Sequence, residues 1–274
     1  MNYLILSRLN ESYSTRRLVQ EIQARNHRPL VESPEGFTLL TMVDLVIPRL
    51  GSFRYHESMK ELRAFSEKFP QIPILNSPKS FHQARHKKMA LEILKGLPQP
   101  KIYRTAPDFP VVIKDCLASQ GQGVFLCHTQ AELELCLSKL PDRNLLFQEF
   151  IQECSGHDVR AFVVGAKVVG AIERFSADPK QEFRSNLSLG GHARNTQLTD
   201  QEKQLVLSAV QRLELDYAGV DFLRSKRGAL LLEVNPSPGF EGLEKCTGLN
   251  IAGEIISHSE VLFQNSQKNI FFES

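Results

Sequence analysis

The chain has 274 residues, of which 42% are hydrophobic and 23% charged, proportions that fit a globular protein of two or three subdomains and exclude a disordered tail or a coiled coil. Lys and Arg number 33 against 31 Asp and Glu, and Trp is absent, so neither charge nor stacking aromatics predict a nucleic-acid partner. Five cysteines without a CxxC pair, no apolar stretch near the roughly 20 residues of a membrane span, and no cleavable leader predict a cytoplasmic protein with reduced thiols and no membrane partner.

Short apolar strands alternate with amphipathic helices at the start of the chain. We expect residues 3–7 to form a strand and residues 15–24 a helix with one apolar face. A second strand follows at 45–47, and a charged helix at 57–68. This order predicts an N-terminal parallel α/β subdomain, which we place at residues 1–80.

The middle of the chain begins with a basic helix. The segment SFHQ has capping-box spacing and predicts one continuous helix from Ser80 to Gly96. A Val-Val-Ile strand at 111–113 then enters a glycine-containing turn. We place a central subdomain at residues 81–148. The capping-box spacing occurs twice more and predicts two further helices, after Thr129 with Glu132 and after Thr199 with Glu202.

Two hairpins are expected in the last part of the chain. Residues 159–164 and 168–172 flank a Gly-Ala-Lys segment and are expected to pair with each other. Residues 219–235 have strand character in both halves and a turn-like Ser-Lys-Arg-Gly between them. We place the C-terminal subdomain at residues 149–274. Strands and helices together predict a mixed α/β (α+β) fold class.

The second hairpin is expected to bring two acids together. With a three-residue turn at residues 226–228, Asp221 lies opposite Glu233, and Asn235 shares the face of Glu233. Like charges opposite each other destabilise a sheet unless a cation or hydrogen bonds lie between them. Two carboxylates and an amide oxygen are ligands that Mg²⁺ accepts together with nucleotide phosphates. The alternative is that both acids are solvated on an outer face.

Several other polar residues suit a nucleotide, each with a plainer alternative. Lys114 precedes a small-residue loop at 118–124 whose N–H groups could approach phosphate oxygens, although such turns are common. Lys87 lies in a basic helix whose charges equally suit a solvated face. Arg184 suits a phosphate and Asn186 a carbonyl or a metal, but a plain surface loop fits both equally well.

Two further observations narrow the chemistry. The strand at 145–151 has a backbone edge that suits an adenine, although core packing fits equally. The histidines are scattered and no Ser–His–Asp or Cys–His arrangement stands out, so nucleophilic catalysis is not indicated. Two separated lysines, a small-residue loop and the Asp–Glu–Asn cluster together predict phosphoryl chemistry on a magnesium nucleotide.

The segments VVIK, SQGQGV, QEFI, DVRAFVVG, FRSNLSLGG, AGVDFLR and EVNPSPGFEG follow one another in this order. The order resembles that of the ATP-grasp carboxylate–amine ligases, and most closely that of the RimK-type glutamate ligases. The resemblance covers nearly the whole chain, and FRSNLSLGG and EVNPSPGFEG are its most specific parts. It implies an ATP-grasp fold, in which two α+β subdomains enclose ATP and follow an N-terminal α/β subdomain.

The resemblance also implies roles for individual residues. Lys114 and Arg184 would be catalytic and would stabilise charge on the transferred phosphoryl group. Mg²⁺, or Mn²⁺ in its place, would be held by Asp221, Glu233 and Asn235. ATP would contact residues on the phosphate side, in an adenine hinge and, at Asp158, on the ribose side: Lys87, Lys114, Ser119, Gly121, Gly123, Gln148, Glu149, Phe150, Ile151, Asp158, Arg184, Ser185 and Asn186.

The reaction implied by the resemblance has two steps. A carboxylate attacks the γ-phosphoryl group of ATP to give an acyl phosphate and ADP, and an amine then displaces phosphate to form an amide. In RimK-like members the amine donor is typically L-glutamate, and the acceptor carboxylate lies on a protein C-terminus or a small molecule. We expect glutamate addition to a protein C-terminus, with a ribosomal protein as the first choice. The alternatives are a small peptide or coenzyme acceptor and a catalytically silent nucleotide-binding regulator; a homo-oligomer is compatible with all three.

Two positions depart from the usual family pattern. Asp115 follows Lys114, where an apolar residue or Pro is more frequent, and we expect its carboxylate to point away from the phosphates. Phe175 stands in IERF where a second Arg is frequent, which predicts altered recognition of the acceptor or the amino acid.

Overall fold

The computed structural model describes residues 1–35, 42–105, 107–118, 123–140, 144–179 and 181–272. The strands, in chain order, are β1 (Asn2–Leu6), β2 (Arg28–Glu32), β3 (Leu45–Pro48), β4 (Ile102–Tyr103), β5 (Val111–Asp115), β6 (Val124–Cys127), β7 (Leu145–Glu149), β8 (His157–Val164), β9 (Lys167–Phe175), β10 (His192–Asn195), β11 (Tyr217–Ser225) and β12 (Gly228–Asn235). The helices are α1 (Tyr13–Ala24), α2 (Tyr55–Lys68), α3 (Pro78–Arg85), α4 (Lys87–Ile93), α5 (Gln130–Ser138), α6 (Asp200–Arg212), α7 (Glu241–Thr247) and α8 (Ile251–Phe272), with single 3₁₀ turns η1 (Gln152–Cys154) and η2 (Leu187–Leu189).

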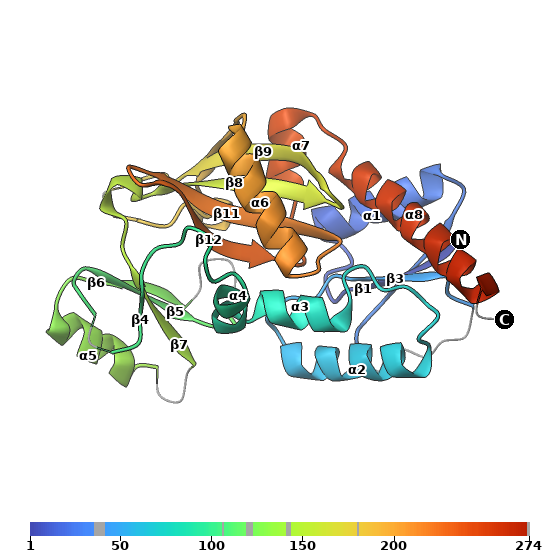
Figure 1. Ribbon diagram of the computed structural model, residues 1–274, viewed down its shortest axis with the longest axis horizontal. Helices are drawn as coiled ribbons and strands as arrows, with labels where there is room; N and C mark the ends of the chain where they lie inside the picture. Colours follow the sequence, from blue (N-terminus) through green and yellow to red (C-terminus); the bar gives the residue numbers. More distant parts are fainter. Residues whose placement is uncertain (36–41, 106, 119–122, 141–143, 180, 273–274) are drawn as a thin grey trace.

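The described strands form three sheets (Figure 1). A three-stranded parallel sheet of order β2-β1-β3 lies toward the two chain ends, as expected for the N-terminal part. A four-stranded antiparallel sheet of order β4-β7-β5-β6 lies at the opposite end with α5. A five-stranded antiparallel sheet of order β10-β9-β8-β11-β12 lies between and above them in this view. The division at residues 80 and 148 stays a prediction.

Strand β1 is buried on both faces because helices cover the parallel sheet on both sides. Tyr3 and Ile5 pack with α1 and α8, whereas Leu4 and Leu6 on the opposite face pack with α2. This explains why the strand is apolar without alternation, as parallel strands buried on both faces usually are. The pairing of α1 with α8 also attaches the C-terminal helix to the N-terminal sheet (Figure 1).

The five-stranded sheet is likewise buried on both faces at its centre. In β8, Val159, Ala161 and Val163 face a core shared with α6 and α4, and Phe162 faces the core of the N-terminal sheet and α8. The apolar residues of β8 therefore join two cores.

No helix in the described part of the chain combines the length and apolarity that crossing a bilayer requires.

The helix expected from Ser80 to Gly96 is two helices, so that prediction is wrong. Ser77, not Ser80, caps α3 by accepting the N–H of Ser80, and α3 ends at Arg85. His86 then has extended backbone and caps α4. The basic pattern does not show this break, because no Pro or Gly marks it.

The other caps follow the sequence more closely. At Thr199 both bonds of the capping box are present, which confirms the prediction for α6. At Thr129 the hydroxyl accepts the N–H of Glu132, but the Glu132 carboxylate accepts from the N–H of His128. The first half of that prediction is therefore confirmed and the reciprocal bond is displaced by one residue.

A buried side chain connects the N-terminal part to the five-stranded sheet. The Nδ2 group of Asn76, which is fully buried, donates to the carbonyl oxygens of Tyr217 and Pro236, each at 2.9 Å. Its Oδ1 accepts from the backbone N–H groups of Asp216 at 2.5 Å and of Tyr217 at 3.2 Å. One amide therefore satisfies four backbone groups at the start of β11 and just beyond β12.

Replacing Asn76 with Ala tests this connection. Asn76→Ala leaves those backbone groups without their partner, and we expect the free energy of unfolding in urea to fall by about 3 kcal/mol. As a matched control, Asn195→Ala removes an exposed amide from edge strand β10 and should change the free energy of unfolding by less than about 0.5 kcal/mol. Equal stabilities of the two variants would contradict the role of Asn76.

Candidate active site

A cavity of about 750 Å³ lies where the three sheets converge. Its walls include Lys114 of the small sheet, Glu233 of the five-stranded sheet and Arg49 beside the parallel sheet. This volume is in the range of pockets that take a nucleotide-sized ligand. Most of the predicted nucleotide and metal residues line it: Lys87, Lys114, Gln148, Glu149, Phe150, Ile151, Asp158, Arg184, Ser185, Asn186, Asp221, Glu233 and Asn235.

The remaining predicted residues belong to the small-residue loop. Ser119 and Gly121 lie outside the described residues. Gly123 has a φ of +67°, and a Cβ there would lie 2.9 Å from Cβ of Asp115, so glycine is required by both conformation and space. The buried Asp115 carboxylate accepts the N–H of Leu117 at 3.0 Å, and Asp115 is not among the described residues that line the cavity.

Two lysines stand on one wall of the cavity. Lys87, the first residue of α4, is buried and donates from Nζ to the carbonyl oxygen of Ala118 at 2.6 Å. Burial lowers the pKa of Lys114 to about 8; the nearby Glu233 carboxylate opposes the shift and Lys87 adds to it. A lysine whose charge is only weakly solvated binds an anion strongly when one arrives.

The end of β7 offers unpaired polar groups to the cavity. Gln148 is buried, and its Nε2 has no hydrogen-bond partner among the described residues. The N–H groups of Phe150 and Ile151 donate to no described residue either. Glu149 is instead engaged, because its carboxylate accepts from Arg227 at 2.7 Å and from the N–H of Lys101. Unpaired donors on a buried chain segment are the arrangement that a purine ring would satisfy.

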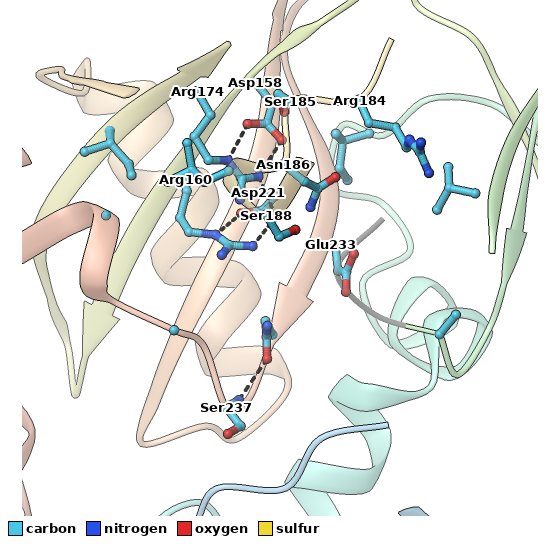
Figure 2. A pocket seen from close by; sticks show the side chains of 18 of the residues that line it. Asp158, Arg160, Arg174, Arg184, Ser185, Asn186, Ser188, Asp221, Glu233 and Ser237 are labelled. Atoms are coloured by element: carbon cyan, nitrogen blue, oxygen red, sulfur yellow. Dashed lines mark hydrogen bonds and ion pairs between the residues drawn. The ribbon is translucent and has the colours of Figure 1, made fainter. Parts of the chain in front are cut away.

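A network of four charged side chains forms part of the cavity wall (Figure 2). Arg174 of β9 donates from Nε and Nη2 to Asp158 at 2.7 and 2.5 Å, and its Nη2 lies 2.9 Å from Oδ2 of Asp221. Arg160 donates from Nε and Nη2 to Asp221, both at 2.7 Å. The two guanidinium groups balance the two carboxylates, which permits their burial.

The pKa values in this network follow from the pairing. Burial alone would raise the pKa of Asp221, but Arg160 and Arg174 lower it to about 2. Burial alone would lower the pKa of Arg174, but Asp158 and Asp221 raise it. Asp221 and Arg174 are therefore both charged at neutral pH.

The hairpin carrying Asp221 and Glu233 has a shorter turn than expected. Ser225 pairs with Gly228, so the turn holds two residues, and the predicted three-residue turn is wrong. Leu232 is then an extra residue on β12, a β-bulge that shifts the register and places Asp221 opposite Glu233. The predicted facing of the two acids is confirmed, although by a different route.

Glu233 differs from Asp221 in its surroundings. It lines the cavity apart from the charge network in Figure 2, and it forms no hydrogen bond or ion pair with any described residue. Oδ1 of Asn235 accepts the N–H of Ser237 at 2.9 Å, which leaves a second lone pair. Among the described residues no group of three or more His, Cys, Asp or Glu side chains gathers around a metal position. The predicted ligand set differs from such a group, because it has two carboxylates and an amide.

The loop before β10 supplies a further cation. Arg184 is paired with Glu182, with Nη2 2.6 Å from Oε2, and its Cζ lies 6.0 Å from the ring centroid of Phe183. The hydrogen bond from Arg184 to Glu182 raises the pKa of Arg184. Gly191 stands at the end of this loop. Only glycine fits at this position, because a Cβ there would lie 2.6 Å from the carbonyl oxygen of Phe175.

Sequence reasoning assigned no role to Arg160, Arg174 or Glu182. A signal was present for Arg160, because Asp158 and Arg160 are two residues apart and so share one face of an otherwise apolar strand. Phe175, the second departure from the family pattern, stacks between His157 and His192, with ring centroids 6.3 and 5.2 Å away.

Residues 88–258 match the family model of the RimK-like ATP-grasp domain. The chain belongs to this family. A probable alpha-L-glutamate ligase of Cellvibrio japonicus (strain Ueda107) is 37% identical over 297 residues, covering 95% of each chain. The chain is accordingly an ATP-dependent ligase, as the sequence motifs implied.

Solved structures of RimK-like and other ATP-grasp ligases share the fold. A RimK domain protein from Sphaerobacter thermophilus has a TM-score of 0.70 at 18% identity, covering 94% of this chain and 99% of that one. The ATP-grasp ligase PsnB, in complex with a minimal precursor, Mg and ADP, has a TM-score of 0.69 at 18% identity, covering 94% and 98%. The predicted ATP-grasp fold is confirmed.

Replacing Arg174 with Met tests the charge network. Arg174→Met leaves the buried Asp158 without its partner, and we expect the free energy of unfolding at neutral pH to fall by about 3–5 kcal/mol. An unpaired buried carboxyl has a raised pKa, so the folded variant should gain stability as pH falls from 7 toward about 5. In the unchanged protein the pKa of Asp221 is depressed. The contribution of Asp221 to the free energy of unfolding is therefore constant down to about pH 4 and is lost only as pH falls through about 2.

Urea unfolding at several pH values measures both effects. Lys79→Met is the matched control, because it removes the exposed ion pair with Glu214 and should cost less than about 1 kcal/mol at every pH. If the stability lost by Arg174→Met does not shrink toward pH 5, the carboxylates do not depend on Arg174.

Proposed function

We propose that this chain joins the amino group of L-glutamate to an acceptor carboxylate at the expense of ATP, through an acyl phosphate. The observation that carries the proposal is the cavity itself. Lys87 and Lys114 stand on one wall, and Glu233, which has no partner in the described part of the chain, stands on another. The sequence similarity of the chain to probable alpha-L-glutamate ligases supports L-glutamate as the amine. We place the reaction in the cytoplasm.

ATP would bind between the two antiparallel sheets. The donors of Gln148, Phe150 and Ile151, which have no acceptor within the described ranges, suit the adenine edge, with Asp158 toward the ribose. Lys87, Lys114 and Arg184 suit the phosphates, and Ser185 and Asn186 lie in the same loop as Arg184. Arg184 and Lys114 would stabilise the charge that develops on the transferred phosphoryl group.

The donor set also fits a divalent cation. Glu233 has no partner among the described residues, Asn235 has a free lone pair, and Oδ1 of Asp221 accepts only one of the three bonds to that carboxylate. These oxygens would hold Mg²⁺, or Mn²⁺ in its place. When bound, the cation neutralises phosphate charge and so makes the γ-phosphoryl group easier to attack.

In the first step an acceptor carboxylate oxygen attacks the γ-phosphorus, the bond to the β-phosphate oxygen breaks, and ADP leaves. The amino group of L-glutamate then attacks the acyl carbon, phosphate leaves with the bonding electrons, and the amine loses a proton. The chain contributes mainly positioning, charge stabilisation and exclusion of water from the acyl phosphate.

We propose a protein or peptide C-terminus as the acceptor, with a ribosomal protein as the first candidate. The complex of PsnB with the precursor peptide PsnA2 supports a peptide substrate in this fold. A small coenzyme acceptor is the second candidate, and the two differ in the mass of the product.

The decisive experiment measures ADP release from magnesium-ATP with each amino acid in turn and a desalted cell extract as the acceptor source. We expect release to depend on L-glutamate, and intact mass analysis to show one protein gaining glutamyl residues. Glutamate-dependent release with only small-molecule products would select the coenzyme acceptor. ATP binding without stimulation by any amino acid would overturn the ligase proposal in favour of a silent regulator.

Glu233→Gln tests the carboxylate in this reaction. The amide keeps the shape but removes the negative charge, and we expect ADP release to fall by about 100-fold or more, the usual cost of losing one group that stabilises the transition state. Glu134→Gln, an exposed position on α5, is the control and should leave the rate unchanged. Full activity of the Glu233→Gln variant would refute the role of Glu233.

The depressed pKa of Lys114 predicts a pH dependence of ATP binding. Above about pH 8 the free protein loses the Lys114 proton, whereas bound phosphates favour the charged form, so ATP affinity should fall by up to tenfold per pH unit. Lys114→Arg keeps its charge over this range and should give a flat profile between about pH 7 and 9.5. Calorimetric titration with ATP at several pH values measures the ATP affinity of the unchanged protein and of the variant. If affinity falls equally with pH in both, a group other than Lys114 titrates.

A further inference from the structure

One region of the cavity is not used by the proposed ATP site. It lies at the carboxyl ends of β1 and β3, which are neighbouring parallel strands. After β1 the chain continues to β2, on the side of β1 away from β3, and after β3 it continues to α2. Ligands of open parallel sheets bind at such a point, beyond the carboxyl ends of the strands. Arg49 follows β3 here, and its backbone N–H donates to the carbonyl oxygen of Leu6 at 2.8 Å.

Arg49 is a half-buried residue, but part of its guanidinium group is fully buried. Arg49 lines the cavity, and its buried Nε and Nη1 atoms have no hydrogen-bond partner among the described residues. Its Cζ lies 6.0 Å from the ring centroid of Phe240, a contact that helps to hold the group in place. Arg160 and Arg174, by contrast, are each paired with a carboxylate. Buried charged donors without acceptors are costly, so this position calls for an anionic ligand.

The surrounding groups leave room for such a ligand. On α7, Glu241 is paired with Lys245 at 2.6 Å, and Glu244 accepts from Tyr13 and Arg17. These carboxylates are therefore already engaged. The N–H groups of Tyr13 and Ser14 in the first turn of α1 donate to no described residue, and Ser14 lines the cavity. The region thus presents unpaired donors, which suit a carboxylate.

We propose that Arg49 binds a carboxylate of the amino-acid substrate, one that does not react. This inference rests on the proposed function. A carboxylate that attacks phosphorus gives up its charge as the acyl phosphate forms, which a fixed guanidinium would oppose. A carboxylate of the incoming L-glutamate keeps its charge through both steps and matches a side chain that is always protonated. Arg49 therefore determines which amine is accepted.

Arg49→Gln tests the assignment through the kinetics of each substrate. Loss of a charge-assisted pair should raise KM for L-glutamate by about 10- to 100-fold and leave KM for ATP within about twofold. Arg49→Lys keeps the charge without the paired geometry and should recover part of the loss. Arg16→Gln, on the exposed side of α1, is the control and should change neither KM.

Two analogues show which carboxylate is bound. L-glutamine lacks the side-chain carboxylate, and the α-amide of L-glutamate lacks the main-chain one. The unchanged protein should discriminate against both. The Arg49→Gln variant should lose its discrimination against only the analogue that lacks the carboxylate bound by Arg49. A rise in KM for the acceptor, with that for L-glutamate unchanged, would overturn the proposal.

A binding measurement separates this inference from the proposed function. Calorimetric titration of L-glutamate into the complex with a non-hydrolysable ATP analogue should show binding that Arg49→Gln weakens, at unchanged thermal stability. Such binding without turnover would contradict the ligase function and support the role of Arg49. Glutamate-dependent turnover with equal glutamate affinity in both proteins would overturn the role of Arg49 alone. Absence of glutamate binding to the unchanged protein would overturn both.

Discussion

Arg174 links two strands of the five-stranded sheet that line the cavity, β8 and β11. Its guanidinium is buried and binds Asp158 of β8 and Asp221 of β11 at once. With Arg160 the four charges sum to zero, which is the condition under which a sheet can carry them away from water. Arg160 and Arg174 are committed to this pairing, and the phosphate contacts are therefore proposed for Lys87, Lys114 and Arg184.

The cavity exists only because three sheets meet. The small sheet contributes Lys114, the five-stranded sheet contributes Glu233, and the parallel sheet contributes Arg49. Asn76 maintains this arrangement by tying the N-terminal part to β11 and to the segment after β12. The proposed division of labour follows from this geometry, with the nucleotide between the antiparallel sheets and the amino acid at the parallel one.

Most of the site residues predicted from the sequence motifs line the cavity, and the short strands among them place alternate residues on one face. The prediction that Asp221 faces Glu233 is confirmed, whereas the predicted turn length is wrong. The two acids still face each other because a bulge at Leu232 compensates for the shorter turn. A break at His86 escaped detection because both helices share one basic composition. Local patterns therefore predicted faces better than they predicted boundaries.

The sequence by itself determined the α/β class, the family and the residue types of the site, because these depend on composition, periodicity and the order of motifs. The tertiary structure alone decided which charges neutralise one another. Asp158 and Asp221 look equally available in the sequence, but strand pairing gives both to Arg174, and Glu233 remains unpaired among the described residues. Arg49 likewise has an ordinary place in the sequence, and only the structure shows that two of its guanidinium nitrogens are buried without an acceptor among the described residues, which supports the role proposed for it. Pairing and burial depend on contacts between segments far apart in the chain, and local sequence does not encode them.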